Sequence, residues 1–298
     1  MEKASGRKRK IIIILLIIIL VGLVLLFVGW NKLQEILFFH PWNDLAAHGK
    51  LRKIEEFQEI KIENKEVSLA GWFWNIQGRK EPAPLVIFFT GNAQNSSNTM
   101  YYFYRSQTMK SVFRDYNLMI IDYPGYGFSK GKPSDDSMFT ASDYVFDYAA
   151  NMKEVDQEHI VIMGYSIGTG VACYCASKNN ASGLILIAPY DKAISLYNDA
   201  IDSFHGPLQS LAKYSFNSVE YAQNVMEPTL IFTSKTDEVI SYKHSLDLAE
   251  HFDALEDIVV LDGVDHNGYF SRTEVLDGIS GFLSKIQDTK NELFDNRN

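Results

Sequence analysis

The chain has 298 residues, of which 46% are apolar and 22% are charged. This is ordinary globular composition, and it excludes a disordered chain, a collagen and a coiled coil. A chain of this length folds as one large domain or two small ones. The two cysteines are too few for a disulfide scaffold.

The net charge of −9 is unevenly spread along the chain. Residues 1–32 hold six basic side chains and one acidic side chain, so residues 33–298 hold 22 basic and 36 acidic ones, a net charge of −14. A nucleic-acid-binding protein needs a basic face. The sequence therefore predicts no nucleic-acid partner, and no long-range attraction of anionic substrates.

The segment 11–30 is twenty residues long and carries no charged side chain. At about 1.5 Å per residue, a helix of this length spans about 30 Å, the thickness of one hydrocarbon core. A cleaved signal peptide has a shorter apolar core and a small-x-small cleavage site, whereas this run ends in Gly29-Trp30-Asn31-Lys32. The segment therefore predicts an uncleaved transmembrane anchor, with the membrane as a partner.

The residues that flank this segment predict its orientation. The four consecutive basic residues Arg7–Lys10 precede it, so the N-terminus 1–10 is expected in the cytoplasm and the catalytic domain outside it. Residues 31–56 are mixed in pattern and are predicted to form a juxtamembrane stalk, broken at His40-Pro41. Four aromatic side chains form either an interfacial belt or a contact with the domain: Trp30, Phe38, Phe39 and Trp42.

Residues 57–288 are expected to form one α/β domain, followed by a polar tail over 289–298. Alternating runs at 57–63 and 67–74 predict a β-hairpin. Continuous apolar runs predict strands of a parallel sheet covered by helices, at 85–90, 118–122, 160–163, 184–188, 230–233 and 258–261. Helices are expected between them, at 97–113, 135–151, 167–179, 241–252 and 273–288. Active sites of such sheets lie at the carboxyl ends of the strands.

The loop after the run 160–163 reads Gly164-Tyr165-Ser166-Ile167-Gly168, the pattern G-x-S-x-G. The pattern alone is weak, but a position between an apolar strand and a helix start is the one that a nucleophile elbow requires. The glycines leave room for a serine in a sharp turn, and the helix N-terminus offers a backbone N–H to a developing oxyanion. The sequence therefore predicts Ser166 as the nucleophile and Ile167 as an oxyanion-hole donor.

A serine nucleophile needs a histidine base and an acid that orients it, and here they are expected in the order serine, acid, histidine. Asp237 follows the run 230–233, and His266 follows the run 258–261. Both therefore lie on strand-end loops in the required order. Asp262 is the alternative acid.

The loop after the run 85–90 begins with Gly91-Asn92-Ala93. A loop in this position supplies the second N–H of the oxyanion hole. Asn92 is the expected donor, and Ala93 is the alternative.

Taken together, these motifs resemble those of the α/β-hydrolase superfamily, specifically its membrane-anchored hydrolases with an H-G-N-A oxyanion loop. The resemblance covers about 60–285 and rests on Thr90-Gly91-Asn92-Ala93, Asp122-Tyr123-Pro124-Gly125-Tyr126-Gly127-Phe128-Ser129, Gly164-Tyr165-Ser166-Ile167-Gly168, Asp237 and Asp265-His266-Asn267. It implies the α/β-hydrolase fold: a mostly parallel central sheet with helices on both faces, here preceded by one transmembrane helix. It also implies that the Gly-Tyr-Gly loop shapes the rim beside the oxyanion hole. Thr90 replaces the family's histidine, so other hydrogen bonds are expected to fix this loop.

The superfamily usually inserts a cap between two late strands, and here a short cap is expected over about 189–228. Its aromatic side chains either pack the cap onto the sheet or face Ser166. They are Tyr190, Tyr197, Phe204, Tyr214, Phe216 and Tyr221.

The predicted function is a membrane-anchored serine hydrolase that cleaves an acyl bond, a carboxylester before others, through an acyl-enzyme. A peptidase, amidase or thioesterase on the same triad is the alternative, and a non-catalytic binding protein on a hydrolase scaffold is a further one. No cofactor and no metal are implied. The expected partners are a small-molecule or lipid-like acyl substrate and the membrane, and the sequence indicates no particular protein partner.

Overall fold

The computed structural model describes residues 2–200 and 205–295, so Phe204 of the expected cap lies outside the described residues. An eight-stranded sheet forms the centre of the domain, in the order β1-β2-β4-β3-β5-β6-β7-β8. The strands are β1 (Phe57–Glu63), β2 (Ser68–Trp74), β3 (Ala83–Phe89), β4 (Asn117–Ile121), β5 (Val155–Tyr165), β6 (Gly183–Ile187), β7 (Thr229–Ser234) and β8 (Leu255–Leu261). β2 is antiparallel to both of its neighbours, and every other pairing is parallel.

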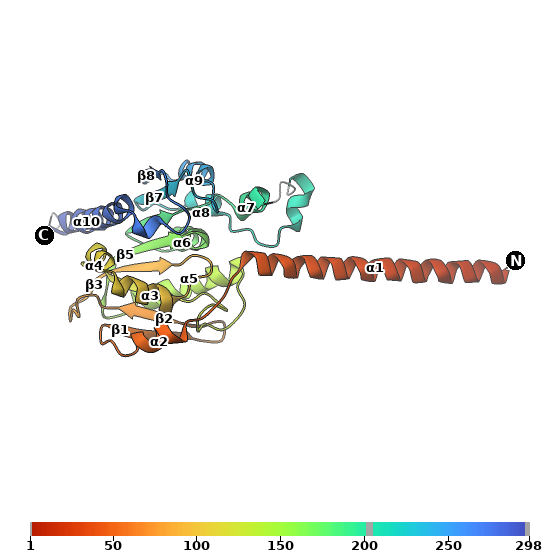
Figure 1. The fold of residues 1–298 in the computed structure, drawn as a ribbon, viewed down its shortest axis with the longest axis horizontal. Helices are drawn as coiled ribbons and strands as arrows, with labels where there is room; N and C mark the ends of the chain where they lie inside the picture. The colour runs from red at the N-terminus through yellow and green to blue at the C-terminus, as the bar shows by residue number, and fades with distance from the viewer. Residues whose placement is uncertain (1, 201–204, 296–298) are drawn as a thin grey trace.

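Helices cover both faces of this sheet (Figure 1). The helices of the described chain are α1 (Glu2–Phe38), which projects from the domain, α2 (Leu45–Leu51), α3 (Ser96–Arg105), α4 (Gln107–Val112), α5 (Asp135–Ala150), α6 (Ile167–Lys178), α7 (Ala193–Ala200), α8 (Ser218–Ala222), α9 (Tyr242–Ala249) and α10 (Thr273–Asp295), with 3-10 turns η1 (Gly206–Leu211) and η2 (Tyr269–Ser271). One apolar core joins the sheet to α5, α6, α8 and α9, and a second joins it to α2, α3, α4 and α10. The expected fold class, a mostly parallel sheet with helices on both faces, is confirmed.

The strands form where continuous apolar runs are buried from both sides. β3, β4, β6 and β7 are buried over their whole length. The single helix expected over 97–113 is instead two helices, because the chain turns at Ser106. The hydroxyl of Ser106 accepts a hydrogen bond from the Met109 N–H at 3.2 Å and caps α4.

Helix α1 projects from the domain, with its N-terminus far from the sheet (Figure 1). Over Ile12–Ile36 it is long and apolar enough to cross a membrane, and its most apolar stretch has no residue buried in the domain. A core helix of a soluble domain has its apolar face buried, whereas the side chains from Ile12 to Leu20 are all about half exposed or more. The helix is therefore not part of the hydrophobic core.

The segment 31–56, predicted as a juxtamembrane stalk, packs on the domain in part. Helix α1 continues to Phe38, and the chain then folds back so that Phe39 and Leu51 are buried in the two cores. Burial of these apolar side chains fixes the segment, because each gains free energy when it leaves water. The aromatic side chains of Phe38 and Phe39 thus contact the domain, which was the alternative to an interfacial belt in the sequence analysis.

Candidate active site

Ser166 lies in the turn between β5 and α6, at the carboxyl end of the sheet. Its backbone is left-handed, with φ of 54°, and its N–H donates to the Ile187 carbonyl at 2.9 Å. A side chain at Gly168 would place its Cβ 2.2 Å from the carbonyl oxygen of Phe89, at the end of β3. The second glycine of the motif is therefore required by the close approach of α6 to the loop after β3.

The structure brings Ser166, His266 and Asp237 into one hydrogen-bonded chain. His266 Nε2 lies 2.9 Å from the Ser166 hydroxyl, and His266 Nδ1 lies 2.9 and 3.0 Å from the two carboxylate oxygens of Asp237. The Asp237 side chain is fully buried and that of His266 nearly so. The alternative acid, Asp262, is exposed and has no place in this chain. The arrangement has the geometry of a nucleophile, a base and an orienting acid.

Asp237 is held as a carboxylate. Burial opposes its ionisation, but hydrogen bonds from His266 and from the N–H groups of Ile240 and Val239 outweigh burial and lower its pKa below the ordinary value of 3.8. The Tyr269 hydroxyl donates to the same carboxylate at 3.0 Å, and burial raises the pKa of that phenol, which keeps it a neutral donor. The carboxylate is therefore charged and fixed, as an acid that selects one imidazole tautomer must be.

Three residues around His266 were missed by the sequence reasoning. The Tyr165 hydroxyl donates to the His266 carbonyl, and the two rings stack at 5.3 Å. The His266 N–H donates to the Glu238 carboxylate at 3.0 Å. Tyr269, the third such residue, binds Asp237 as described above. Tyr165 and Glu238 adjoin predicted site residues, and this adjacency is the only signal that the sequence offered.

The two expected oxyanion donors lie beside Ser166. Ile167 begins α6, and both Ile167 and Asn92 line the cavity over the Ser166 hydroxyl. Within the described part of the chain, neither backbone N–H has a protein acceptor. The structure thus brings both predicted donors to the cavity, and their role in an oxyanion hole stays a prediction.

The Asn92 side chain fixes its loop by hydrogen bonds to two other segments. Its amide donates to the Phe38 carbonyl at 2.8 Å, and its oxygen accepts from the His40 N–H at 2.9 Å and the Tyr126 hydroxyl at 2.7 Å. The Trp42 indole donates to the carbonyl of the next residue, Ala93. The oxyanion loop is therefore tied to the C-terminal end of α1.

The loop after β4 supports the same region. The buried Asp122 carboxylate accepts from the N–H groups of Ser96 at 2.6 Å and Phe128 at 3.0 Å. Gly127 has φ of 49°, and a Cβ there would lie 1.9 Å from an oxygen of Asp122. The Asp122 carboxylate thus requires glycine at position 127 of the Gly-Tyr-Gly turn. The Tyr126 hydroxyl of this turn donates to the Asn92 side chain.

A cavity of about 610 Å³ lies over Ser166. Among the described residues, its lining includes no aspartate, glutamate, lysine or arginine. Tyr197 is the one described aromatic of the expected cap that lines it, whereas Tyr190, Tyr214 and Phe216 are buried in the core. Most of the cap aromatics therefore pack the cap onto the sheet.

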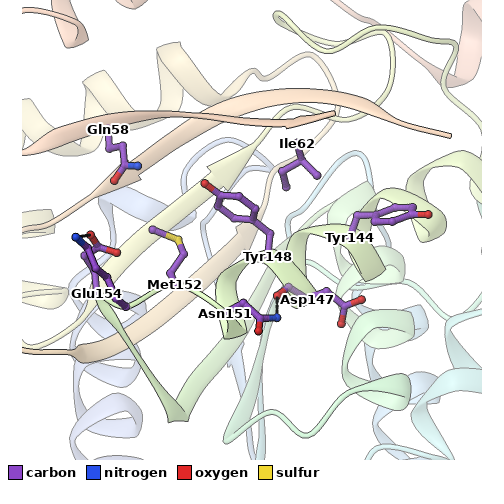
Figure 2. A pocket seen from close by; sticks show the side chains of 9 residues that line it. Gln58, Ile62, Tyr144, Asp147, Tyr148, Asn151, Met152 and Glu154 are labelled. Carbon is purple, nitrogen blue, oxygen red and sulfur yellow. Dashed lines mark hydrogen bonds and ion pairs between the residues drawn. The ribbon is translucent and has the colours of Figure 1, made fainter. Parts of the chain in front are cut away.

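A second depression, of about 590 Å³, lies between β1 and the C-terminal part of α5. Figure 2 shows Gln58 and Ile62 of β1 facing Tyr148 of α5. No member of the Ser166–His266–Asp237 chain lines it. We therefore place the chemistry in the cavity over Ser166.

Comparisons with known proteins agree with this fold. The family model described as the alpha/beta hydrolase fold matches residues 84–208. The chain is 27% identical over 167 residues to the alpha/beta hydrolase domain-containing protein aho-3 of Caenorhabditis elegans, over 56% of this chain and 48% of that protein. It is 23% identical over 258 residues to an uncharacterised protein of Mycobacterium tuberculosis, over 86% of each.

Solved structures share the fold. An esterase of Pyrococcus furiosus superposes with a TM-score of 0.64 at 14% identity, over 84% of this chain and 97% of that one. Est1E of Butyrivibrio proteoclasticus, with ferulic acid bound, superposes with a TM-score of 0.60 at 17% identity, over 77% of this chain and 99% of that one. The match to aho-3 spans about half the length of that relative.

Fold, family model and relatives together support the α/β-hydrolase fold. The resemblance of the motifs to the α/β-hydrolase superfamily agrees with the family model and with the relatives. Membership of the membrane-anchored group with an H-G-N-A loop stays a prediction.

Proposed function

We propose that the protein is a membrane-anchored serine hydrolase that cleaves carboxylester bonds through an acyl-enzyme. The observation that carries the proposal is the unbroken hydrogen-bonded chain from Ser166 through His266 to the buried Asp237. It lies under a cavity that Ile167 and Asn92, the proposed oxyanion donors, also line. No metal or cofactor has a part in this proposal.

The reaction proceeds in two halves. The Ser166 oxygen attacks the acyl carbon while His266 Nε2 takes the hydroxyl proton, and the Ile167 and Asn92 N–H groups stabilise the oxyanion. His266 then gives that proton to the leaving alcohol, and the acyl group stays on Ser166. Water, deprotonated by His266, attacks the acyl-enzyme; the bond to Ser166 then breaks, His266 returns the proton to the Ser166 oxygen, and the acid is released. Asp237 holds the imidazole in one tautomer and stabilises its cation.

The lining of the cavity favours neutral acyl substrates. Leu33, Phe38, Leu196, Val239 and Ile240 supply apolar surface, and the polar groups beside them are amides and hydroxyls. An anionic leaving group finds no cationic partner among the described lining residues, because His266 must be neutral to act as the base. Neutral esters are therefore the proposed substrates.

A fluorophosphonate probe tests the proposal directly, because it reacts with an activated serine. The purified full chain should be labelled, and a panel of p-nitrophenyl esters, thioesters and aminoacyl amides should be cleaved with esters fastest. Cleavage of amides with no ester hydrolysis would replace the esterase proposal by a peptidase. If the protein is neither labelled nor active on any of these substrates, the hydrolase proposal is wrong and the alternative of a non-catalytic binding protein is favoured.

Acyl-chain length should control the rate. Each CH₂ that enters an apolar pocket gains about 0.8 kcal/mol, or about fourfold in kcat/KM. We expect kcat/KM for p-nitrophenyl esters of two to sixteen carbons to rise through the short and medium chains and then level off as the cavity fills. A steady rise to sixteen carbons would mean a deep tunnel in place of this cavity.

The rate should also depend on pH. The base must be unprotonated to accept the Ser166 proton, so kcat/KM should rise with pH through one ionisation. The lowered pKa of Asp237 keeps that carboxylate charged above pH 3.8, so it adds no second ionisation at higher pH. Its contribution to stability is full above this value and is lost only as pH falls through the lower, folded-state pKa. A profile that is flat between about pH 5 and pH 9 would argue against His266 as the base.

The proposed topology has the domain outside the cytoplasm. The basic cluster Arg7–Lys10 favours a cytoplasmic N-terminus, and an apolar helix of this length resists extraction. The full chain should stay with membranes in alkaline carbonate, and protease added to intact spheroplasts should digest the domain. Protection until detergent is added would reverse the orientation.

A further inference from the structure

Helix α1 forms one wall of the cavity over Ser166. Trp30, Leu33, Gln34 and Phe38 all line this cavity, opposite residues of the strand-end loops. These four positions recur at intervals of one to four residues, so they lie along one face of the helix. The helix that carries the proposed anchor is thus also a part of the proposed substrate site.

This wall is fixed to the domain by specific contacts. The buried Gln34 amide donates to the Leu211 carbonyl at 3.1 Å, and its oxygen accepts from the Lys213 N–H at 2.8 Å. The Phe38 ring stacks on Tyr197 at 5.6 Å and on Phe216 at 5.7 Å. The helix therefore leaves the domain in a set direction, beside η1 and the cap (Figure 1).

The position of this wall relative to the membrane follows from the length of the apolar segment. About 30 Å of hydrocarbon takes up the twenty residues that end at Trp30, and tryptophan favours the membrane surface. The Trp30 indole donates to the Leu211 carbonyl at 2.9 Å, which places η1 at the same level. The side chains of Leu208 and Leu211 on η1 are 50% and 44% exposed, so this level also carries free apolar surface.

We propose that the anchor helix is part of the acyl-binding site, and that the cavity takes its acyl chain from the bilayer surface. The chain of a membrane-resident ester lies against Leu33 and passes Trp30 into the lipid, while its carbonyl reaches Ser166. The inference rests on the proposed serine hydrolase function. It adds the substrate class, an ester whose acyl chain is dissolved in the membrane that holds the enzyme.

A pair of variants on one helix tests the proposal in phosphatidylcholine vesicles that carry the full chain. Leu33→Asn alters the wall, and Ile36→Asn is the matched control, because Ile36 is similarly exposed but does not line the cavity. The two substrates are water-soluble p-nitrophenyl butyrate and 4-methylumbelliferyl palmitate embedded in the same vesicles. For Leu33→Asn, the ratio of kcat/KM for palmitate to that for butyrate should fall about tenfold, and for Ile36→Asn it should stay at the wild-type value.

Surface dilution gives the second measurement. When phosphatidylcholine is added at a constant total amount of embedded palmitate ester, the rate should fall with the mole fraction of ester in the bilayer. The inference is overturned if the rate does not change with the mole fraction of ester, or if Leu33→Asn and Ile36→Asn have the same ratio of kcat/KM for palmitate to that for butyrate. In either case, hydrolysis of butyrate would still support the proposed function. A wild-type protein that cleaves neither ester overturns the proposed function and this inference with it.

Discussion

Ser166→Ala should abolish fluorophosphonate labelling and lower kcat by up to about 10⁶-fold, which leaves only the catalysis that binding and the oxyanion hole provide. The fold should not change, because alanine adopts the left-handed backbone of Ser166 at the same cost and loses one hydroxyl. Single-turnover hydrolysis of p-nitrophenyl butyrate measures the loss, and thermal unfolding measures the fold. The expected Tm lies within a few degrees of the wild-type value, about what a loss below 1 kcal/mol produces.

Ser177→Ala is the matched control for this variant. Ser177 lies on the same helix, α6, and its hydroxyl donates to the Tyr174 carbonyl, one turn away, at 2.8 Å. It should keep wild-type labelling and rate. Wild-type hydrolysis by Ser166→Ala would show that the acyl group is carried by another residue or by none.

The sequence predicted the parts of the site that depend on local pattern. Apolar runs such as 184–188 are buried from both faces wherever they occur in a covered parallel sheet, so strand positions followed from composition. The end of a strand in turn predicted where Ser166, Asp237 and His266 lie. Parallel strands bring their carboxyl ends to one edge, and residues 100 apart in sequence therefore meet.

The sequence could not predict the contacts that depend on the path of the chain between elements. The bond from Asn92 to the Phe38 carbonyl joins residues 54 positions apart, and the bond from Trp30 to the Leu211 carbonyl joins residues 181 positions apart. Neither pair lies on neighbouring strands, so no periodicity brings the partners together. The segment 31–56 has mixed polarity for the same reason: Leu51 packs in the core of the sheet, Phe38 stacks on Tyr197, and the Trp42 indole donates to the Ala93 carbonyl.

Asp237→Asn should lower kcat by about 10⁴-fold with little change in the binding of substrate. The asparagine keeps the shape of the side chain, and its oxygen can still accept from Ile240 and Val239. Its amide, however, donates toward His266 Nδ1, which favours the tautomer with the proton on Nε2. That tautomer cannot take the Ser166 proton. The imidazolium that forms in the transition state also loses the buried negative charge that stabilises it.

Asp262→Asn is the control for Asp237→Asn, because Asp262 was the alternative acid and lies exposed on the loop that carries His266. It should keep kcat within about twofold of wild type, as a surface substitution away from the site does. The measurement is kcat and KM of both variants on p-nitrophenyl butyrate, with probe labelling beside it. A large loss for Asp262→Asn and a small one for Asp237→Asn would reassign the acid, because the penalty belongs to the carboxylate that holds the imidazole during proton transfer.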